Sequence, residues 1–145
     1  MNYFLLVATV SLIVQLVVIS LVLIGFYLKR HFKYRLHGLI MTTALVSHLA
    51  VIFGVMIPSF VIGLVPIILS SPTSLIGWFS PLHAIAGSVT AILGVWIVGS
   101  WRFRQSLNFC LPKKRIMLIT FAFWLISLTL GIIFYFILNW SYLFG

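Results

Sequence analysis

Long apolar runs separated by short polar stretches dominate the pattern of this chain. A helix that spans the hydrocarbon core of a bilayer needs about 20 consecutive apolar residues. Four segments meet this requirement, at about residues 4–28, 36–57, 75–101 and 116–138. The pattern therefore predicts an all-α integral membrane protein in which residues 1–145 form a single domain of four transmembrane helices.

The stretch from Pro58 to Thr73 separates the second and third segments and is apolar but interrupted. It contains Pro58, Gly63, Pro66 and Pro72. A proline inside a helix removes one backbone hydrogen bond and clashes with the carbonyl group one turn earlier. We therefore expect a Pro/Gly-rich loop that is too short to span, and that lies in the membrane interface or folds over the end of the bundle.

The composition agrees with a membrane protein and excludes several kinds of chemistry. Hydrophobic residues make up 63% of the chain and charged residues 6%, whereas a soluble domain carries roughly 25% charged residues. The chain has no Asp and no Glu. This absence excludes carboxylate acid–base catalysis, a Ser-His-Asp triad and a carboxylate proton relay. We expect the chain not to be an enzyme, unless it proves to be a redox subunit.

The basic residues predict the topology. All nine fall in the first and third connections: Lys29, Arg30, Lys33, Arg35, Arg102, Arg104, Lys113, Lys114 and Arg115. Four antiparallel helices place these two connections on one side, which the positive-inside rule makes cytoplasmic. We therefore expect an antiparallel bundle in the cell membrane with both termini outside, anchored at the cytoplasmic interface by these side chains. The positive charge then faces lipid headgroups and not nucleic acid.

The chain has four histidines, and three of them lie within predicted spans. His31 falls in the basic connection and is expected to be solvated. His48 follows His37 by eleven residues, on nearly the same helix face as Met41. Ionisable residues at membrane depth usually face the bundle interior. For His48, a neutral imidazole bonded to a neighbouring helix is the commoner case, and a ligand or proton-handling role is the alternative.

The predicted third helix carries a stripe of small residues that begins one turn after His83. The fourth helix has a similar stripe at the same spacing. The two sets are Gly87, Thr90, Ala91 and Gly94, and Thr120, Trp124, Ser127 and Gly131. Small residues next to a histidine can let a porphyrin edge lie against a helix, but close helix packing uses them more often. The stripes therefore predict packing first. Gln15, mid-span in the first helix, is expected to bond to another helix.

Estimated depths limit which histidines can share a cofactor. Measured from the cytoplasmic interface at 1.5 Å per residue, His37 lies ~3 Å deep, His48 ~20 Å and His83 ~28 Å. His37 and His83 therefore cannot share a metal. A haem b or quinone site formed by His48 and His83, with Gly87 beside it, would need helix tilt to bring them level. The cofactor is left open, with haem b as one alternative.

Copper is a less favoured alternative. His37 and Met41 lie one turn apart, and imidazole with thioether suits Cu(I). A third ligand would have to come from Cys110 or Met117, across the cytoplasmic connection.

Several short segments of the sequence resemble segments of one protein family. Tyr34-Arg-Leu-His37-Gly-Leu-Ile-Met41 is similar to the start of the second helix in small membrane proteins of the CtaM/YozB type. Leu82-His83-Ala-Ile-Ala-Gly87 and Trp101-Arg-Phe-Arg104 resemble that family's third helix and its end, and Thr120 to Gly131 fits the fourth. The resemblance covers about Arg35 to Phe136. It implies a role in assembly or activity of haem–copper oxidases and functional histidines at His37 and His83. Lys113 occupies the position of a third histidine.

Three functions follow from these observations. The leading one is an accessory protein of the aerobic respiratory chain that assists assembly or stability of a haem–copper oxidase or quinol-oxidising complex. Its partners would be the bilayer and other membrane subunits of that complex. The second is an electron-transfer subunit with a b-type haem or quinone site at His48 and His83. The third is a purely structural subunit of a larger membrane assembly.

Overall fold

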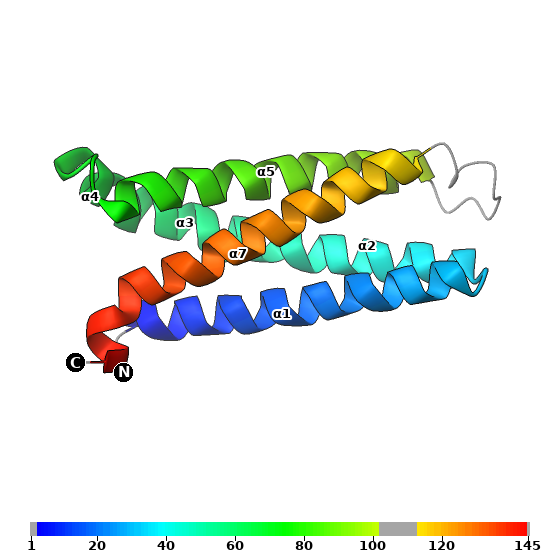
Figure 1. The fold of residues 1–145 in the computed structure, drawn as a ribbon, viewed down its shortest axis with the longest axis horizontal. Coiled ribbons are helices and arrows are strands. Elements are labelled where there is room, and N and C mark those ends of the chain that lie inside the picture. Colours follow the sequence, from blue (N-terminus) through cyan, green and yellow to red (C-terminus); the bar gives the residue numbers. More distant parts are fainter. Residues whose placement is uncertain (1–2, 102–112, 145) are drawn as a thin grey trace.

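The chain is helical throughout the residues that the computed structural model describes, 3–101 and 113–144, and these ranges contain no strand. The long helices are α1 (Tyr3–Arg30), α2 (Tyr34–Val51), α5 (Leu75–Trp101) and α7 (Lys114–Phe144), which lie side by side along one axis (Figure 1). Four helical segments are long and apolar enough to cross a membrane: Leu6–Arg30, Tyr34–Ser70, Leu75–Trp101 and Lys114–Asn139. The predicted set of four apolar, membrane-compatible helices is confirmed. Arg102, Arg104 and Cys110 lie outside the described residues.

The helix surfaces are apolar on their outward faces. Phe53, Ile62 and Ile92, from three parts of the chain, are 67%, 76% and 68% exposed. Exposing so many large apolar side chains to water would be unfavourable for one small protein. Exposing them to lipid tails is not, and a helix can face lipid because its backbone N–H and C=O groups are hydrogen-bonded within the helix.

The predicted interfacial loop from Pro58 to Thr73 is wrong, because the second helix continues as far as Ser70. After α2 the chain runs without interruption through η1 (Ile52–Met56), α3 (Ile57–Ser59), η2 (Phe60–Leu64) and α4 (Val65–Ser70). The elements η1 and η2 are π-helical turns. This gives a helical segment of 37 residues, and only a short connection separates it from α5.

The π-helical turns explain how this segment accommodates its prolines. Each turn is followed by a proline at the second residue of the next helix, Pro58 in α3 and Pro66 in α4. The N–H of Ile57 bonds to the carbonyl of Ile52, and the N–H of Val65 to that of Phe60, five residues back in each case. Proline has no N–H group to donate, and its ring would clash with the carbonyl group one turn earlier in a regular α-helix. The wider π-helical turns leave room for the ring and keep the neighbouring N–H groups hydrogen-bonded.

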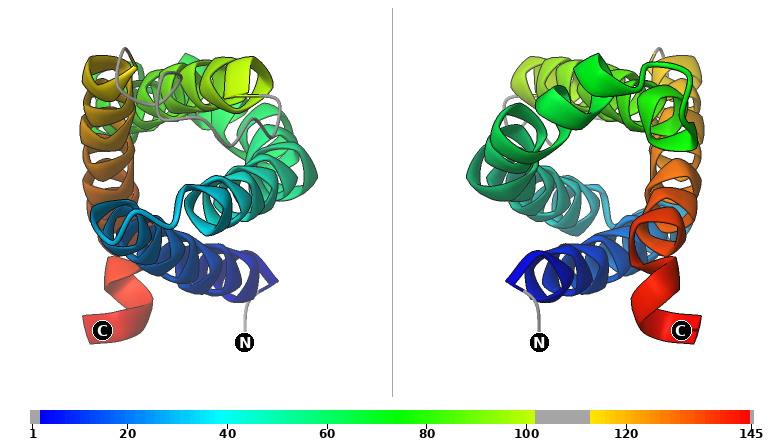
Figure 2. Two further views of the ribbon diagram at one scale, coloured as in Figure 1. Left: turned by 90° about the vertical axis from the view of Figure 1, so that its right-hand side faces the viewer. Right: turned by 90° about the vertical axis from the view of Figure 1, so that its left-hand side faces the viewer.

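The helices associate as two pairs. Contacts are most numerous between α1 and α2 and between α5 and α7. His37, near the start of α2, bonds to Gly25, near the end of α1, and Lys113, just before α7, bonds to Ser100, near the end of α5. Contacts between the pairs are fewer. End views show the long helices arranged around a common axis (Figure 2). The start of α1, the end of α7 and α4 lie at one end of the molecule, and the α1–α2 turn lies at the other (Figure 1).

Small residues allow the helices to approach closely at the end that carries the α1–α2 turn. Gly38 of α2 packs directly on the ring of Trp101, and a Cβ atom at Gly94 would lie 2.7 Å from Leu45 Cδ1. Such contacts are the usual basis of helix packing in membranes, because apolar burial between helices gives little advantage over lipid.

We expect Gly38→Ala to destabilise the protein by about 1–3 kcal/mol, because the added methyl group overlaps the rigid Trp101 ring. Gly99→Ala is the matched control: no atom lies within 4 Å of the new methyl group, so helix propensity should make it neutral or stabilising by up to about 1 kcal/mol. Unfolding of both variants in mixed detergent measures the difference. Equal stability of the two variants would contradict the packing at Gly38.

Candidate functional site

The larger of two cavities among the described residues lies between the two helix pairs and measures about 480 Å³. All the long helices and the segment from η1 to α4 line it, and most of its wall is apolar. Its polar lining residues are Ser11, Gln15, His48, Ser59, Ser80, His83, Ser88, Ser127, Tyr135 and Asn139. A mostly apolar cavity with a few polar groups is typical of sites for apolar ligands. We call it the larger cavity.

His48 occupies the centre of the bundle at 2% exposure. Its Nδ1 lies 3.1 Å from Oε1 of Gln15 on α1 and, in this orientation of the amide, donates to it. The ring of Trp124 on α7 packs beside the imidazole, with centroids 4.9 Å apart. The backbone of Gly87 on α5 is also close, although no hydrogen bond of normal geometry reaches Nε2. His48 therefore contacts groups from all three other long helices.

His83 lines the same cavity from α5. Its Nδ1–H donates to the backbone carbonyl of Ser127 on α7, at 2.9 Å. Gly131, one turn after Ser127, makes room for the imidazole: a Cβ atom there would lie 2.9 Å from Cε1 of His83. The two stripes meet near His83, where a Cβ atom at Gly87 of α5 would lie 3.3 Å from Oγ of Ser127 on α7, whereas Gly94 of α5 approaches Leu45 of α2. The close approach at Gly131 gives His83 access to a backbone carbonyl.

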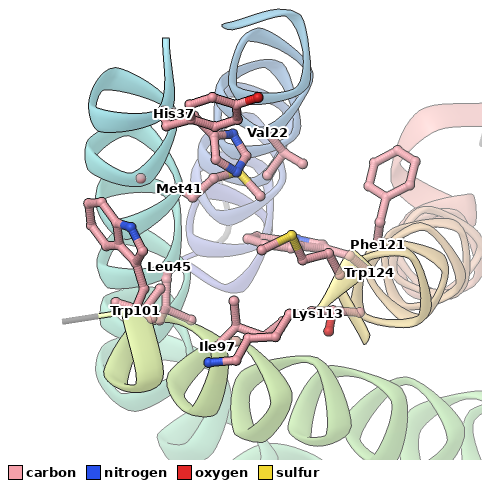
Figure 3. A pocket seen from close by; sticks show the side chains of 15 residues that line it. Val22, His37, Met41, Leu45, Ile97, Trp101, Lys113, Phe121 and Trp124 are labelled. Atoms are coloured by element: carbon pink, nitrogen blue, oxygen red, sulfur yellow. The ribbon is translucent and has the colours of Figure 1, made fainter. Parts of the chain in front are cut away.

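His37 lines a second, smaller cavity of about 70 Å³ near the basic end, together with Met41, Trp101 and Lys113 (Figure 3). Its Nδ1–H donates to the carbonyl of Gly25 on α1, at 2.7 Å. His37 and His83 therefore line different cavities, in line with the expectation that they do not share a metal.

The structure brings together some of the residues considered for copper. Met117 lines the smaller cavity with His37 and Met41, and its sulfur lies 3.8 Å from Nζ of Lys29. Among the residues described, no three His or Cys side chains gather in a metal-binding group. Cys110 lies outside them.

No family model, curated protein or solved structure matches the chain. The resemblance to CtaM/YozB-type proteins, and the role in oxidase assembly that it implies, therefore stay predictions. Lys113, which stands where that resemblance places a third histidine, lines the smaller cavity with His37 and donates to the hydroxyl of Ser100.

The basic residues that the structure describes lie at the end of the molecule that carries the α1–α2 turn. Lys29 and Arg30 end α1, and Lys113 to Arg115 lie at the start of α7 (Figure 1). His31 is exposed in the turn, as expected, with its ring beside Tyr27.

Sequence reasoning missed several polar residues of the larger cavity, among them Tyr135 and Asn139. The hydroxyl groups of Tyr135 and Thr9 lie 2.9 Å apart and link α7 to α1. A usable signal was present, because Tyr135 and Asn139 extend the four-residue spacing of Ser127 and Gly131 along one face of α7.

We expect neutral His37 and His83 to carry their proton on Nδ1. A carbonyl oxygen can only accept, so each Nδ1 must donate, which leaves Nε2 with a lone pair. Nitrogen-15 chemical shifts of labelled histidine distinguish the two tautomers. His31, which is exposed, should instead show the solution mixture. Finding Nε2–H at His37 or His83 would contradict the geometry.

Proposed function

We propose that the chain is a small multi-pass membrane protein that binds a lipid-soluble redox ligand, a b-type haem or a quinone, in the larger cavity. The observation that carries this proposal is a cavity of about 480 Å³ with two imidazoles, His48 and His83, in an otherwise mostly apolar wall. Such a protein acts as an electron-transfer subunit.

The bonding of His83 supports this proposal. A histidine whose Nδ1–H is held by a carbonyl presents Nε2 as a lone pair, which is the usual arrangement of ligating histidines. That lone pair can coordinate iron or accept a hydrogen bond. Because the chain has no carboxylate, imidazoles are the cavity groups best suited to either task.

The respiratory chain is the setting that we propose for this site. The resemblance to CtaM/YozB-type proteins supports it, and it keeps an accessory role in oxidase assembly open. The sparse contacts between the two helix pairs suit a chain that packs against partner subunits, so a structural role within a larger complex belongs to the same proposal.

For the topology, we propose an antiparallel four-helix bundle in the cell membrane with both termini outside. The described basic residues gather at one end, and the segment from η1 to α4 lies toward the other. The positive-inside rule makes the basic end cytoplasmic.

The ligand can be tested directly. Protein extracted in mild detergent should carry b-type haem, visible in a reduced-minus-oxidised spectrum, or an extractable quinone. His83→Ala should raise the Kd of the ligand about tenfold, which corresponds to about 1.4 kcal/mol of lost binding free energy. His31→Ala, in the exposed turn, should leave it unchanged. Wild-type protein that carries and binds neither ligand would refute the proposal.

The topology predicts a labelling pattern. In a Cys110→Ser background, Ser71→Cys should react with a membrane-impermeant maleimide added to intact cells, whereas His31→Cys should react only after the cells are opened. Both positions are exposed, so accessibility depends on the side of the membrane alone. The reverse pattern would show that the basic end is outside.

A further inference from the structure

Gln15 and His48 form a polar pair in the wall of the larger cavity and retain unused hydrogen-bonding capacity. Gln15 is 7% exposed and His48 2% exposed. Beyond the bond between them, Nε2 of Gln15 and Nε2 of His48 are buried without a hydrogen-bond partner among the described residues. An unpaired polar group in an apolar surrounding is destabilising, so a ligand that pairs with it gains affinity.

The pair offers at least one donor and one acceptor, whichever way its internal bond runs. With Nδ1–H of His48 donating to Oε1, the amide N–H groups of Gln15 remain donors and Nε2 of His48 is an acceptor. With the amide reversed, one N–H donates to Nδ1, which leaves Oε1 as the acceptor and both the second amide N–H and Nε2–H as donors. A hydroxyl group both donates and accepts at one oxygen, whereas a carbonyl oxygen only accepts.

We propose that the Gln15–His48 pair recognises the hydroxyl group of a quinol, so that the cavity prefers the reduced form of a lipid-soluble quinone to the oxidised form. This inference rests on the proposed function and selects one of its two ligand classes. Both Nε2 atoms are buried, so this recognition requires the Gln15 side chain to turn its amide toward the ligand.

The rest of the wall fits an apolar ring with a long tail. The aromatic side chains of Phe60, Trp124 and Phe134 line the cavity, and His83 offers a second polar group for the other oxygen of the ring. Ile57 and Val61 line the same cavity and are 45% and 57% exposed, so the described protein leaves this side of the wall partly uncovered. The wall therefore reaches the lipid-facing surface, where a tail can leave.

The test titrates the full chain in detergent, without oxygen, with decylubiquinol and with decylubiquinone. The quinol should bind about tenfold more tightly, because the quinone leaves one group of the pair unsatisfied. For a two-electron couple, this preference raises the midpoint potential of the bound quinone by about 30 mV. Gln15→Met, which keeps the volume and removes both polar atoms, should abolish the preference.

Ser20→Ala is the matched control. Ser20 lies on α1 like Gln15 but is exposed and outside the cavity lining, and its hydroxyl donates within its own helix to the carbonyl of Leu16, at 2.9 Å. This variant should keep the preference for quinol. The dimethyl ether of decylubiquinol, which has no hydroxyl hydrogen, should bind wild-type protein about tenfold more weakly than the quinol, and this measurement needs no variant.

Equal affinity for quinol and quinone, or a preference that survives Gln15→Met, would overturn the role of the pair. Decanol binding as tightly as the quinol would show that a hydroxyl is recognised without the ring, and would overturn the quinol assignment. Finding haem in the cavity and no quinol binding would overturn this inference and leave the proposed function intact. If neither haem nor quinone binds, the proposed function itself fails.

Discussion

The structure depends on one constraint: in a lipid environment, polar groups must find their partners within the protein. Within each helix, the backbone N–H and C=O groups are hydrogen-bonded to one another, and several hydroxyl side chains also find their partners in the same helix. Ser11, Thr42 and Thr90 each donate to the carbonyl four residues earlier in their own helix. The imidazoles of His37 and His83 instead donate to backbone carbonyls of a neighbouring helix. Within the described part of the chain, Gln15 and His48 each keep one buried nitrogen without a hydrogen-bond partner.

The same constraint explains why prolines did not break the second helix. A loop exposed to lipid would leave backbone groups unpaired, whereas a π-helical turn keeps most of them bonded and leaves room for the proline ring. The consequence reaches the candidate site. Residues of η1, α3, η2 and α4 form one wall of the larger cavity, among them Ile52, Phe60 and Ile67. A loop over the end of the bundle would have left that side open.

Glycines connect the packing to the chemistry. Gly131 lies where the His83 imidazole approaches α7, and a Cβ atom there would lie 2.9 Å from Cε1 of His83. At Gly25 the side chain that approaches most closely is Met41, whose sulfur would lie 2.8 Å from a Cβ atom. Packing and ligand binding were alternative explanations of the small-residue stripe that follows His83 on α5. They are compatible in the structure, because the residues that let α5 and α7 pack also hold His83 at the cavity wall with its Nδ1 fixed.

Hydropathy alone determined the four apolar helices and the helical fold class, because length and apolar character suffice to recognise a spanning segment. It also marked Gln15, His48 and His83 as residues that should face other helices, since a polar group at that depth has few alternatives.

Only the tertiary structure decided that Pro58 and Pro66 lie within a helix, because the widened turns are set by hydrogen bonds five residues apart that no local pattern reveals. Only the tertiary structure could bring His48 and His83 to one cavity, since depth counted along straight helices ignores tilt and the rotation of each helix about its axis. The gathering of Tyr135 and Asn139 with them has the same cause: a cavity is the space left between helices, and its walls are fixed by how the two pairs pack together.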